Sequence, residues 1–287
     1  MVRVAIQGYK GCFHEQAARL FYSCHSEPSS CHSERSEESL SIVECDTFEG
    51  LYQAMEEGRA DAAVMAIENT VSGGLIHNFE LLRSRNVPVK GEVYIRIEQN
   101  LMALPGQRLV DIREVRTHYM AINQTRPWFE KNAPWIRLTE SEDTAKSAAQ
   151  IAQNGEKGVG AVASALAAQL YGLQIMAPGI ETYKQNFTRF LILDPKLQLP
   201  REQTDKAILC FTLPHKPGSL AQILTILSFY EMNLTRIQSL PIPGKEWQYF
   251  FYADIKFSSL ERYRQALSAV RPLLEDLQIL GEYKAAL

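Results

Sequence analysis

The stretch Ala62-Ala-Val-Met-Ala-Ile-Glu-Asn-Thr-Val-Ser-Gly-Gly74 joins an apolar run to a polar turn. Ala62–Ile67 carries no polar side chain, which is typical of a short strand buried on both faces of a sheet. The polar residues 68–74 follow at the carboxyl end of that strand, where open α/β sheets collect their ligands. The stretch therefore predicts a parallel α/β sheet with a polar site at one edge.

The same alternation of short strands and helices continues to about residue 194. Asp46-Thr-Phe-Glu49 is typical of a helix start, because Asp46 and Glu49 can each accept a bond from a free backbone N–H, and Gly58 ends that helix. Further strands are expected at Val2–Ile6, Val93–Ile97, Glu114–Thr117, Ile136–Leu138, Gln174–Ala177 and Phe187–Leu193. Ala-rich helices are expected at Thr144–Ala152 and Ala161–Leu170. This pattern predicts mostly parallel sheets covered by helices, and its length favours two lobes.

A polar segment with two prolines, Asp194–Asp205, is expected to be a linker. The elements beyond it follow in the order βαββαβ. They are Lys206–Leu213, helix Gly218–Phe229, Leu234–Leu240, Trp247–Phe257, helix Ser259–Leu274 and Leu277–Tyr283. This is the ferredoxin-like order, so we expect an α/β region followed by a smaller α+β domain.

Composition excludes several classes of protein. Hydrophobic residues make up 46% and charged residues 22%, which excludes disorder of the whole chain. The formal charge of -3 disfavours a nucleic-acid partner, and no apolar run approaches the roughly 18 residues of a membrane span. Met1 leads straight into strand-like sequence without the features of a signal peptide, and the 5 cysteines are an odd number. We therefore expect a cytoplasmic protein with reduced thiols.

Ser23–Ser41 has a different composition, rich in Ser and Glu and almost without apolar residues. It repeats Cys24-His-Ser-Glu27 as Cys31-His-Ser-Glu34, and thiolate with imidazole suits zinc. The segment lacks both a Cys-x-x-Cys turn and a core to hold the ligands. We expect a disordered surface insertion and no metal.

Gly8-Tyr-Lys-Gly-Cys-Phe-His14 follows the first strand and precedes a helix. Free N–H groups at a helix start favour anions, so an anion-binding turn and a plain tight turn both remain open. The turn has neither the dinucleotide glycine pattern nor a P-loop Gly-Lys-Ser/Thr, which disfavours nucleotide binding. Cys12 beside the helix start can be a reactive thiol of lowered pKa, but we favour a packing cysteine.

Three motifs together carry a resemblance. Asn186-Phe-Thr-Arg-Phe190, Glu68-Asn-Thr70 with its following glycines, and the Gly8 to Gly11 opening resemble the prephenate dehydratase family. Lys216-Pro-Gly-Ser-Leu220 before a helix resembles the ACT domain appended to that family. The resemblance spans essentially the whole chain outside Ser23–Ser41.

The resemblance implies a two-lobe catalytic region similar to type II periplasmic-binding folds, with the active site in the cleft between the lobes. The catalytic region would be 1–194, with lobe I at about 1–77 and 178–194 and lobe II at about 78–177. The ACT domain would be 206–287. The implied reaction is that of a hydro-lyase, converting prephenate to phenylpyruvate, water and carbon dioxide in phenylalanine biosynthesis. It includes no redox step, so no cofactor is expected.

The resemblance also implies the site residues. The catalytic set would be Thr188, Asn69, Glu68, Gln124 and Thr117, and the substrate-binding set would be Arg189, Thr70, Gly11, Cys12, His118 and Phe190. Three of these positions or their neighbours depart from the family, because Thr117 stands where serine is usual, Tyr119 replaces a proline, and Cys12 stands where a hydroxyl residue is common.

A threonine hydroxyl is a weak acid, so we expect Thr188 to donate a hydrogen bond to the departing hydroxyl, with Asn69 and Gln124 positioning the substrate. His118 is the better acid by pKa but can equally cap a loop, so we rank it below Thr188. Arg189 can meet a substrate carboxylate, or it can form a structural ion pair, because it points opposite to Thr188 on an extended strand. The protonation state of Glu68 stays open.

In the ACT domain the resemblance implies an L-phenylalanine effector, bound through Gly218, Ser219, Leu220, Gln238 and Ser239. Gln238-Ser-Leu-Pro241 replaces the usual Glu-Ser-Arg-Pro and loses both charges. A structural dimerisation module is the alternative. We expect a homodimer or a homotetramer.

Two other functions remain open. Arogenate, which has an amino group in place of the keto oxygen of prephenate, can be the preferred substrate. A non-catalytic two-lobe amino-acid sensor is the other, although the retained Thr188 and Asn69 argue against it. A solute receptor or a transcription regulator is disfavoured, because neither a signal peptide nor a basic helix-turn-helix is evident.

Overall fold

The computed structural model describes residues 1–25, 40–198 and 200–286. The chain divides into two compact units, Met1–Gly74 with Val93–Phe190, and Leu75–Glu92 with Leu191–Leu287. The chain passes between them along β5 (Val89–Arg96) and β11 (Phe187–Leu193). In the described residues, none of the helices combines the length and apolarity that crossing a bilayer demands.

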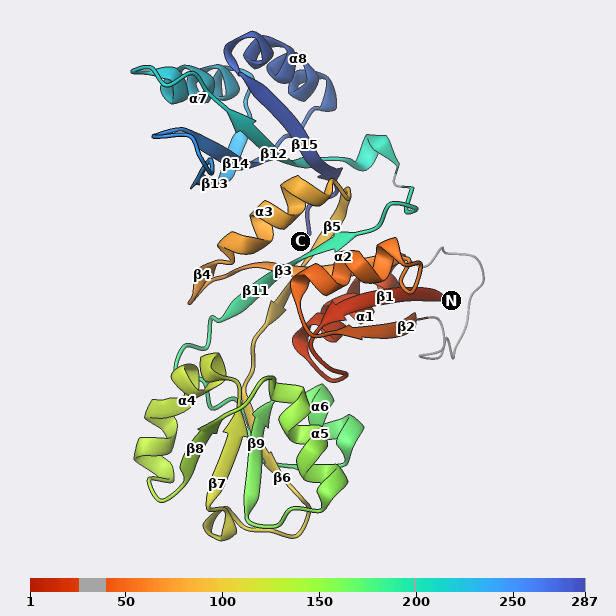
Figure 1. Ribbon diagram of the computed structural model, residues 1–287, viewed down its shortest axis with the longest axis vertical. Helices are drawn as coiled ribbons and strands as arrows, with labels where there is room; N and C mark the ends of the chain where they lie inside the picture. Colours follow the sequence, from red (N-terminus) through yellow and green to blue (C-terminus); the bar gives the residue numbers. More distant parts are fainter. Residues whose placement is uncertain (26–39, 199, 287) are drawn as a thin grey trace. The chain divides into compact units, whose positions relative to one another are not determined.

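The first sheet of unit 1 begins at the N-terminus (Figure 1). Its elements are β1 (Val2–Gln7), α1 (Phe13–His25), β2 (Leu40–Cys45), α2 (Phe48–Glu56), β3 (Ala62–Asn69) and β4 (Gly73–Gly74). Strands β2 and β3 lie on either side of β1 and run parallel to it. Ala62–Ile67 is buried throughout, as expected for a strand covered on both faces. The predicted parallel sheet is confirmed.

The second sheet of unit 1 has the strand order β10-β6-β9-β7-β8. Its elements are β6 (Asn100–Ala103), β7 (Glu114–Thr117), α4 (Tyr119–Asn132), β8 (Arg137–Glu140), α5 (Thr144–Asn154), β9 (Val159–Ala163), α6 (Ala165–Tyr171) and β10 (Gln174–Ala177), with a short 3-10 turn at Leu109–Asp111. Strand β7 is parallel to its neighbours β8 and β9, whereas β6 is antiparallel to β9 and β10. The connections 97–99 and 178–186 join this sheet to the first.

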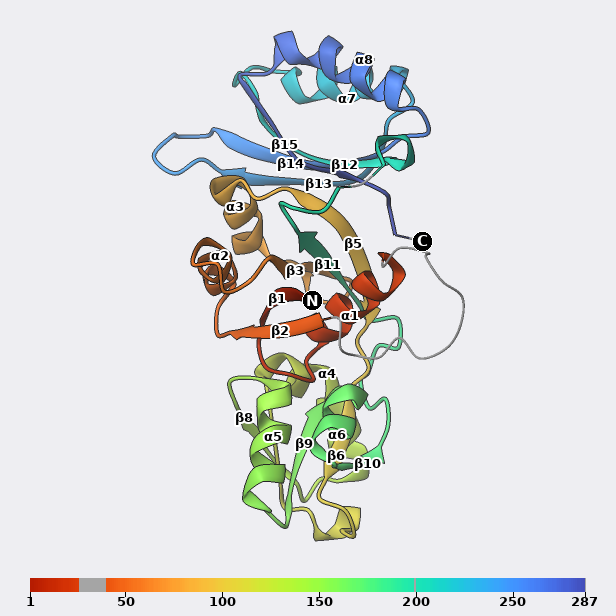
Figure 2. The ribbon, with the colours of Figure 1, turned by 90° about the vertical axis from the view of Figure 1, so that its right-hand side faces the viewer.

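Unit 2 contains the predicted βαββαβ order. Its elements are α3 (Ile76–Arg85), β12 (Lys206–Thr212), α7 (Ser219–Phe229), β13 (Asn233–Pro241), β14 (Tyr249–Lys256), α8 (Leu260–Val270) and β15 (Asp276–Tyr283), with 3-10 turns at Arg201–Gln203 and Arg271–Leu273. The antiparallel order β13-β14-β12-β15 is ferredoxin-like, and α7 and α8 cover one face of it (Figure 2). The predicted α+β fold of this region is confirmed.

A buried ion pair holds the first half of β5 inside unit 2. Lys206 Nζ donates to both carboxylate oxygens of Glu92, at 2.8 and 2.7 Å, and the Tyr283 hydroxyl donates to the same carboxylate at 3.1 Å. Strand β15 approaches β5 so closely at Gly281 that a Cβ there would lie 2.5 Å from Val89. A larger residue than glycine would separate the two strands.

The predicted helix Ala161–Leu170 is wrong in its first half. Residues 159–163 form β9, the strand between β6 and β7, and helix α6 starts only after Ser164, whose Oγ accepts from Ala167 N at 3.0 Å. Alanine favours a helix in isolation, but a Cβ at Gly160 would lie 3.0 Å from the Met102 carbonyl oxygen, so this segment fits a crowded sheet.

Three smaller expectations also change. Helix α2 is capped by Thr47, whose Oγ1 accepts from Gly50 N at 3.1 Å, and not by Asp46 with Glu49. The expected disordered insertion Ser23–Ser41 is wrong at its two ends, since α1 continues to His25 and β2 starts at Leu40, and the rest of it lies outside the described residues. Its Cys31-His repeat lies outside the described residues. Among the elements without a counterpart in the prediction are strands β2 and β6 and helices α3 and α4.

The core of the first sheet predicts a pH-dependent stability. The His14 ring packs against the rings of Phe190 and Phe48, at centroid distances of 4.9 and 5.8 Å, and its Nε2 accepts from Ala66 N at 3.4 Å. Burial lowers the pKa of His14 to about 3, from an ordinary value of 6.5. Between these values the unfolded chain binds the extra proton, so the free energy of unfolding falls as the pH falls, by about 1.4 kcal/mol per pH unit.

We therefore expect His14→Gln, which does not titrate, to lose about 2 kcal/mol less stability than the wild type between pH 6.5 and 5. Urea unfolding at the two pH values measures this. His77→Gln is the control, because His77 is exposed, and it should keep the wild-type slope. Parallel losses in His14→Gln and wild type would contradict the prediction.

Candidate functional site

The ends of β3 and β11 bring the predicted Thr188 and Asn69 into direct contact. Asn69 Nδ2 donates to Thr188 Oγ1 at 2.9 Å, and also to Asn186 Oδ1 at 2.7 Å and to the Phe187 carbonyl at 3.2 Å. Thr188 is 9% exposed. Its hydroxyl thus accepts a hydrogen bond, and its own proton has no acceptor among the described residues.

The orientation of the Asn69 amide is fixed by its other end. Asn69 Oδ1 accepts from Val71 N at 2.9 Å and from Ser72 N at 2.8 Å. Two backbone donors require an oxygen at that position, so the nitrogen must face Thr188. Both ends of this amide are therefore occupied by the protein, and it holds Thr188 in place.

Asn186 contacts Asn69 and so belongs to this site, although in the sequence it stands out only as part of the Asn186–Phe190 motif. Its side chain is 1% exposed, and its Nδ2 has no partner among the described residues. An unsatisfied buried donor lowers the free energy of unfolding by about 1–3 kcal/mol, so the unpaired Asn186 Nδ2 points to a role in the site. The feature of the sequence that could have identified Asn186 as a site residue is its position two residues before Thr188.

The neighbouring Arg189 and Glu68 form an ion pair. Arg189 Nη1 lies 3.1 Å from Glu68 Oε1, with 2% of the Arg189 side chain and 32% of the Glu68 side chain exposed. Of the two interpretations of Arg189, the structure favours the structural ion pair. Thr70 Oγ1 joins the same two strands, because it donates to the Gln185 carbonyl at 3.1 Å and accepts from Phe187 N at 2.9 Å.

The turn after β1 is occupied by the protein's own groups. Gly11 N donates to Glu15 Oε2 at 2.6 Å, Lys10 N donates to Glu44 Oε1 at 2.7 Å, and the Gly11 carbonyl accepts from Ser164 Oγ at 2.5 Å. Two carboxylates thus already occupy N–H groups that an anion would need. Of the two interpretations left open, the structure favours the plain tight turn.

Gly11 and Cys12 have packing roles. A Cβ at Gly11 would lie 2.8 Å from the Ala167 Cα of α6, and the φ of Gly11 is +90°. Cys12 is buried, and burial raises the pKa of its thiol to about 12, so the structure favours the packing interpretation over the reactive thiolate. Phe190 is likewise buried, against His14.

Thr117 and His118 lie at the start of α4. Thr117 Oγ1 donates to the Val162 carbonyl at 2.6 Å, and His118 Nδ1 accepts from Met120 N at 3.3 Å, so His118 caps the helix, as one interpretation predicted. Burial lowers the pKa of His118, whereas the charge of Asp143 acts to raise it. No described hydrogen bond joins either residue to Thr188.

Asp143 was not among the predicted site residues. Its Oδ1 accepts from Lys146 N at 2.8 Å as the cap of α5, and burial raises the pKa of its carboxyl group. A Cβ on Gly8 would lie 2.9 Å from Asp143 Oδ2, so only a glycine leaves room for this carboxylate. The signal was an Asp-Thr step before an Ala-rich helix.

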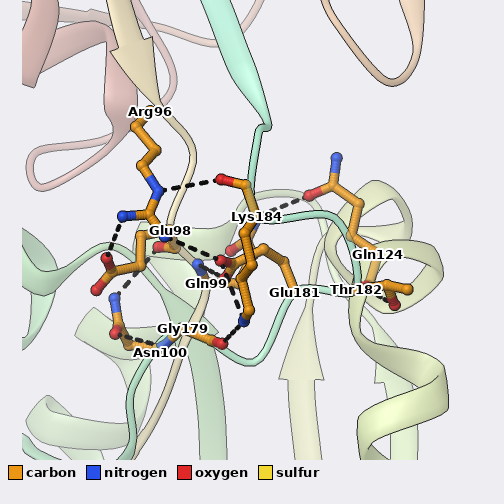
Figure 3. A network of polar contacts seen from close by, with 9 residues as sticks. All are labelled: Arg96, Glu98, Gln99, Asn100, Gln124, Gly179, Glu181, Thr182 and Lys184. Carbon is orange, nitrogen blue, oxygen red and sulfur yellow. Dashed lines mark hydrogen bonds and ion pairs between the residues drawn. The ribbon is translucent and has the colours of Figure 1, made fainter.

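Gln124, on α4, belongs to a polar network that spans the two connections between the sheets (Figure 3). Its Oε1 accepts from Gln99 Nε2 at 3.2 Å, and its carbonyl accepts from Thr182 N at 2.8 Å and from Thr182 Oγ1 at 2.9 Å. Gln99 was not predicted as a site residue. Single amides in a loop carry no sequence signal that distinguishes them.

The predicted effector residues lie in unit 2. Gly218, with a φ of +82°, caps α7, and Ser219 N donates to the Lys216 carbonyl at 3.2 Å. Leu220 packs against the core, while Gln238 Nε2 donates to the Ser239 carbonyl at 3.0 Å on β13. No described hydrogen bond joins residues 218–220 to β13. Across residues 1–25, 40–198 and 200–286, no group of three or more His, Cys, Asp or Glu side chains could hold a metal ion.

The Glu68–Arg189 pair yields a stability prediction. Glu68→Gln replaces the carboxylate that lies 3.1 Å from the buried guanidinium by a neutral amide, and we expect it to lower the free energy of unfolding by about 1–3 kcal/mol. The matched control is Glu57→Gln, because Glu57 and Arg59 form an exposed pair at 2.7 Å that water screens, so we expect the smaller loss there. Urea unfolding at neutral pH measures both, and equal losses would contradict the prediction.

The chain is similar to known enzymes along its whole length. A profile described as prephenate dehydratase matches residues 4–198. A bifunctional chorismate mutase/prephenate dehydratase of Aquifex aeolicus is 34% identical over 289 residues, which cover 100% of this chain and 74% of that protein. Arogenate dehydratase 5 of Arabidopsis thaliana is 35% identical over 300 residues, 98% of this chain and 67% of that protein.

Solved structures are similar too. GqqA, described as a novel type of quorum quenching acylase, has a TM-score of 0.83 at 29% identity and covers 99% of this chain and 98% of its own. The prephenate dehydratase of Arthrobacter aurescens in complex with L-Phe has a TM-score of 0.82 at 27% identity, covering 99% of this chain and 90% of its own. The match over residues 4–198 and the relatives above 30% identity show that the chain belongs to the prephenate dehydratase family.

Proposed function

We propose that this protein catalyses the decarboxylative dehydration of prephenate to phenylpyruvate. The observation that carries the proposal is the Thr188 hydroxyl, which accepts a hydrogen bond from Asn69 Nδ2 and keeps its proton free of described acceptors. The residues lie in the two motifs on which the family resemblance rests.

The reaction asks little of the protein beyond orientation and one proton. The bond from the ring to its carboxylate breaks, and its electron pair enters the ring. The bond to the ring hydroxyl breaks at the far side of the ring, and the leaving oxygen takes the electron pair and one proton to become water. Aromatisation of the ring provides the driving force, so a positioned hydrogen-bond donor is the main requirement.

Thr188 suits that requirement because Asn69 polarises it. A hydroxyl that accepts a hydrogen bond is a better donor in turn, and the effect is greater where water is largely excluded. Since Asn69 Oδ1 is anchored by two backbone N–H groups, the donor direction of the amide is set before a substrate arrives. Asn69 therefore acts through Thr188, and Asn186 Oδ1 holds the Asn69 amide from the other side.

The remaining predicted residues have different support. Glu68 and Arg189 brace the strand end that carries Thr188, and Thr70 ties β3 to the segment before β11. Gln124 is the predicted substrate contact with an amide nitrogen that has no described protein acceptor. Substrate contacts by Thr117, His118, Gly11, Cys12 and Phe190 stay predictions.

Two other classes of substrate are included in the assay, arogenate and a substrate for acyl transfer. Arogenate is favoured by the relatives named arogenate dehydratase, at 31% to 35% identity. Acyl transfer is suggested by GqqA, but a threonine nucleophile needs a base that accepts its proton, and Thr188 contacts none among the described residues. The geometry therefore supports the dehydratase over the acylase.

Turnover of prephenate by purified protein, followed as ultraviolet absorbance of phenylpyruvate, tests the function. We expect Thr188→Ala to lower kcat by about 10²-fold or more, because it removes the positioned donor, and Thr188→Ser to retain most of it. Thr225→Ala, on an exposed face of α7, is the matched control and should stay at the wild-type rate.

The same assay with arogenate, and with an N-acyl homoserine lactone, separates the alternatives. Turnover of the lactone alone would refute the dehydratase proposal. A Thr188→Ala variant with unchanged kcat on prephenate would remove that hydroxyl from the mechanism.

We further propose that the region 206–287 is an ACT domain that senses L-phenylalanine, following a catalytic region at 1–194 with its lobes as predicted. The βαββαβ order and the L-Phe complex of the Arthrobacter aurescens protein support this. A homodimer or homotetramer in the cytoplasm fits the proposal, with no cofactor.

Millimolar L-phenylalanine should lower the rate on prephenate and raise Tm, because an effector that binds the folded state stabilises it. D-Phenylalanine at the same concentration is the control. If the L-enantiomer moves neither quantity, the region is a structural dimerisation module.

A further inference from the structure

The two connections between the sheets of unit 1 share one polar network (Figure 3). Gln99, on the first connection, donates its backbone N–H to Glu181 Oε2 at 2.9 Å, on the second connection. Asn100 Oδ1 accepts from Gly179 N at 3.1 Å, and Arg96 Nε donates to the Lys184 carbonyl at 3.2 Å. These contacts fix the backbone around Gln99.

Gln99 itself is buried and incompletely paired. It is 4% exposed, its Nε2 donates to Gln124 Oε1 at 3.2 Å, and its Oε1 has no partner among the described residues. Burial to this degree leaves little of the Gln99 side chain open to a substrate. Its one described side-chain contact is the amide of Gln124, so any influence on chemistry passes through Gln124.

Gln124 has little freedom apart from its amide. Its carbonyl is held by Thr182 through both the backbone N–H and the hydroxyl. The last torsion of a glutamine side chain is soft, so the amide can present either its oxygen or its nitrogen in a given direction. In the structure Gln99 offers a donor, its Nε2, and the Gln124 oxygen faces that donor. The nitrogen then points away from the network, as Figure 3 shows.

We propose that Gln99 is a positioning residue that fixes the Gln124 amide so that its nitrogen faces the substrate. This inference rests on the proposed function, in which the substrate is an oxygen-rich dianion. A dianion offers acceptors, so it needs N–H groups, and an amide turned the other way would set oxygen against oxygen. Gln99 Oε1 has no described partner, so only the nitrogen end of the Gln99 amide takes part in this contact.

The test replaces the donor by an acceptor of the same shape. Gln99→Glu offers Gln124 a carboxylate, so the Gln124 amide should rotate, give its nitrogen to the carboxylate and present its oxygen outward. We expect KM for prephenate to rise by about 10-fold to 100-fold, as for loss of a hydrogen bond to a charged group, with kcat changed less than about 3-fold. Gln99→Met removes the partner without reversing it and should raise KM less.

A double-mutant cycle separates positioning from a general structural effect. In a Gln124→Met background, Gln99→Glu should raise KM by less than about 3-fold further, because no amide is left to turn. Gln169→Glu, exposed on α6, is the control for added negative charge in the same unit. Tm is measured for every variant, and if Gln99→Glu does not fold, the cycle is run with Gln99→Met.

The outcomes separate the two proposals. If the wild type turns over prephenate and the Gln99 effect on KM is the same with and without the Gln124 amide, the positioning role is wrong and the proposed function stands. A fall in kcat alone, without a change in KM, also overturns the positioning role. A wild type without turnover overturns both.

Discussion

The site depends on one side-chain amide between two strands. Asn69, at the end of β3, uses its oxygen for two backbone N–H groups of the following turn and its nitrogen for the start of β11. Because each end accepts only one kind of partner, the amide cannot turn over without losing at least three hydrogen bonds. The position of Thr188 and the direction of its free proton both follow from this constraint.

Neutral amide side chains, rather than charged ones, make the contacts that orient Thr188 and Gln124. Asn69, Asn186, Gln99 and Gln124 each contact another amide or the Thr188 hydroxyl, while nearby charged groups are paired within the protein, as Arg189 is with Glu68. An amide has a donor end and an acceptor end, so its orientation carries information that an ammonium or carboxylate lacks. A reaction that needs a proton delivered to one oxygen of a polyanion benefits from donors whose direction is fixed.

The sequence predicted helices and strands best where the spacing of apolar residues and the length of the segment indicate the same element. The βαββαβ unit emerged because its helices carry apolar residues at helical spacing and its strands are short and bounded by turns. Residues 161–163 were predicted as helix because alanine has a strong helical propensity. The close packing between β6 and β7 that favours a strand there is a property of the sheet and not of the local sequence. Tertiary context decided that segment.

The residues of the site likewise divide into those that the sequence predicted and those that only the structure revealed. The Thr-Arg-Phe triplet and Glu68-Asn69 stand out as motifs, so the sequence predicted Thr188 and Asn69 as site residues. It assigned Asn69 to the substrate, and the direct contact between Asn69 and Thr188 emerged only from the structure. Gln99 could not be found, because its role depends on which end of a partner amide it meets, and that is decided by backbone contacts far apart along the chain. The turn Gly8–His14 was misjudged in the opposite direction, because its pattern suggested an anion site that the protein already fills. Glu15 and Glu44 accept hydrogen bonds from two of its N–H groups, and the sequence alone does not show that these side chains lie there. An incoming anion would have to displace a carboxylate there. Among the described residues, by contrast, the Thr188 hydroxyl, the Asn186 Nδ2 and the outward nitrogen of Gln124 are donors without a protein acceptor.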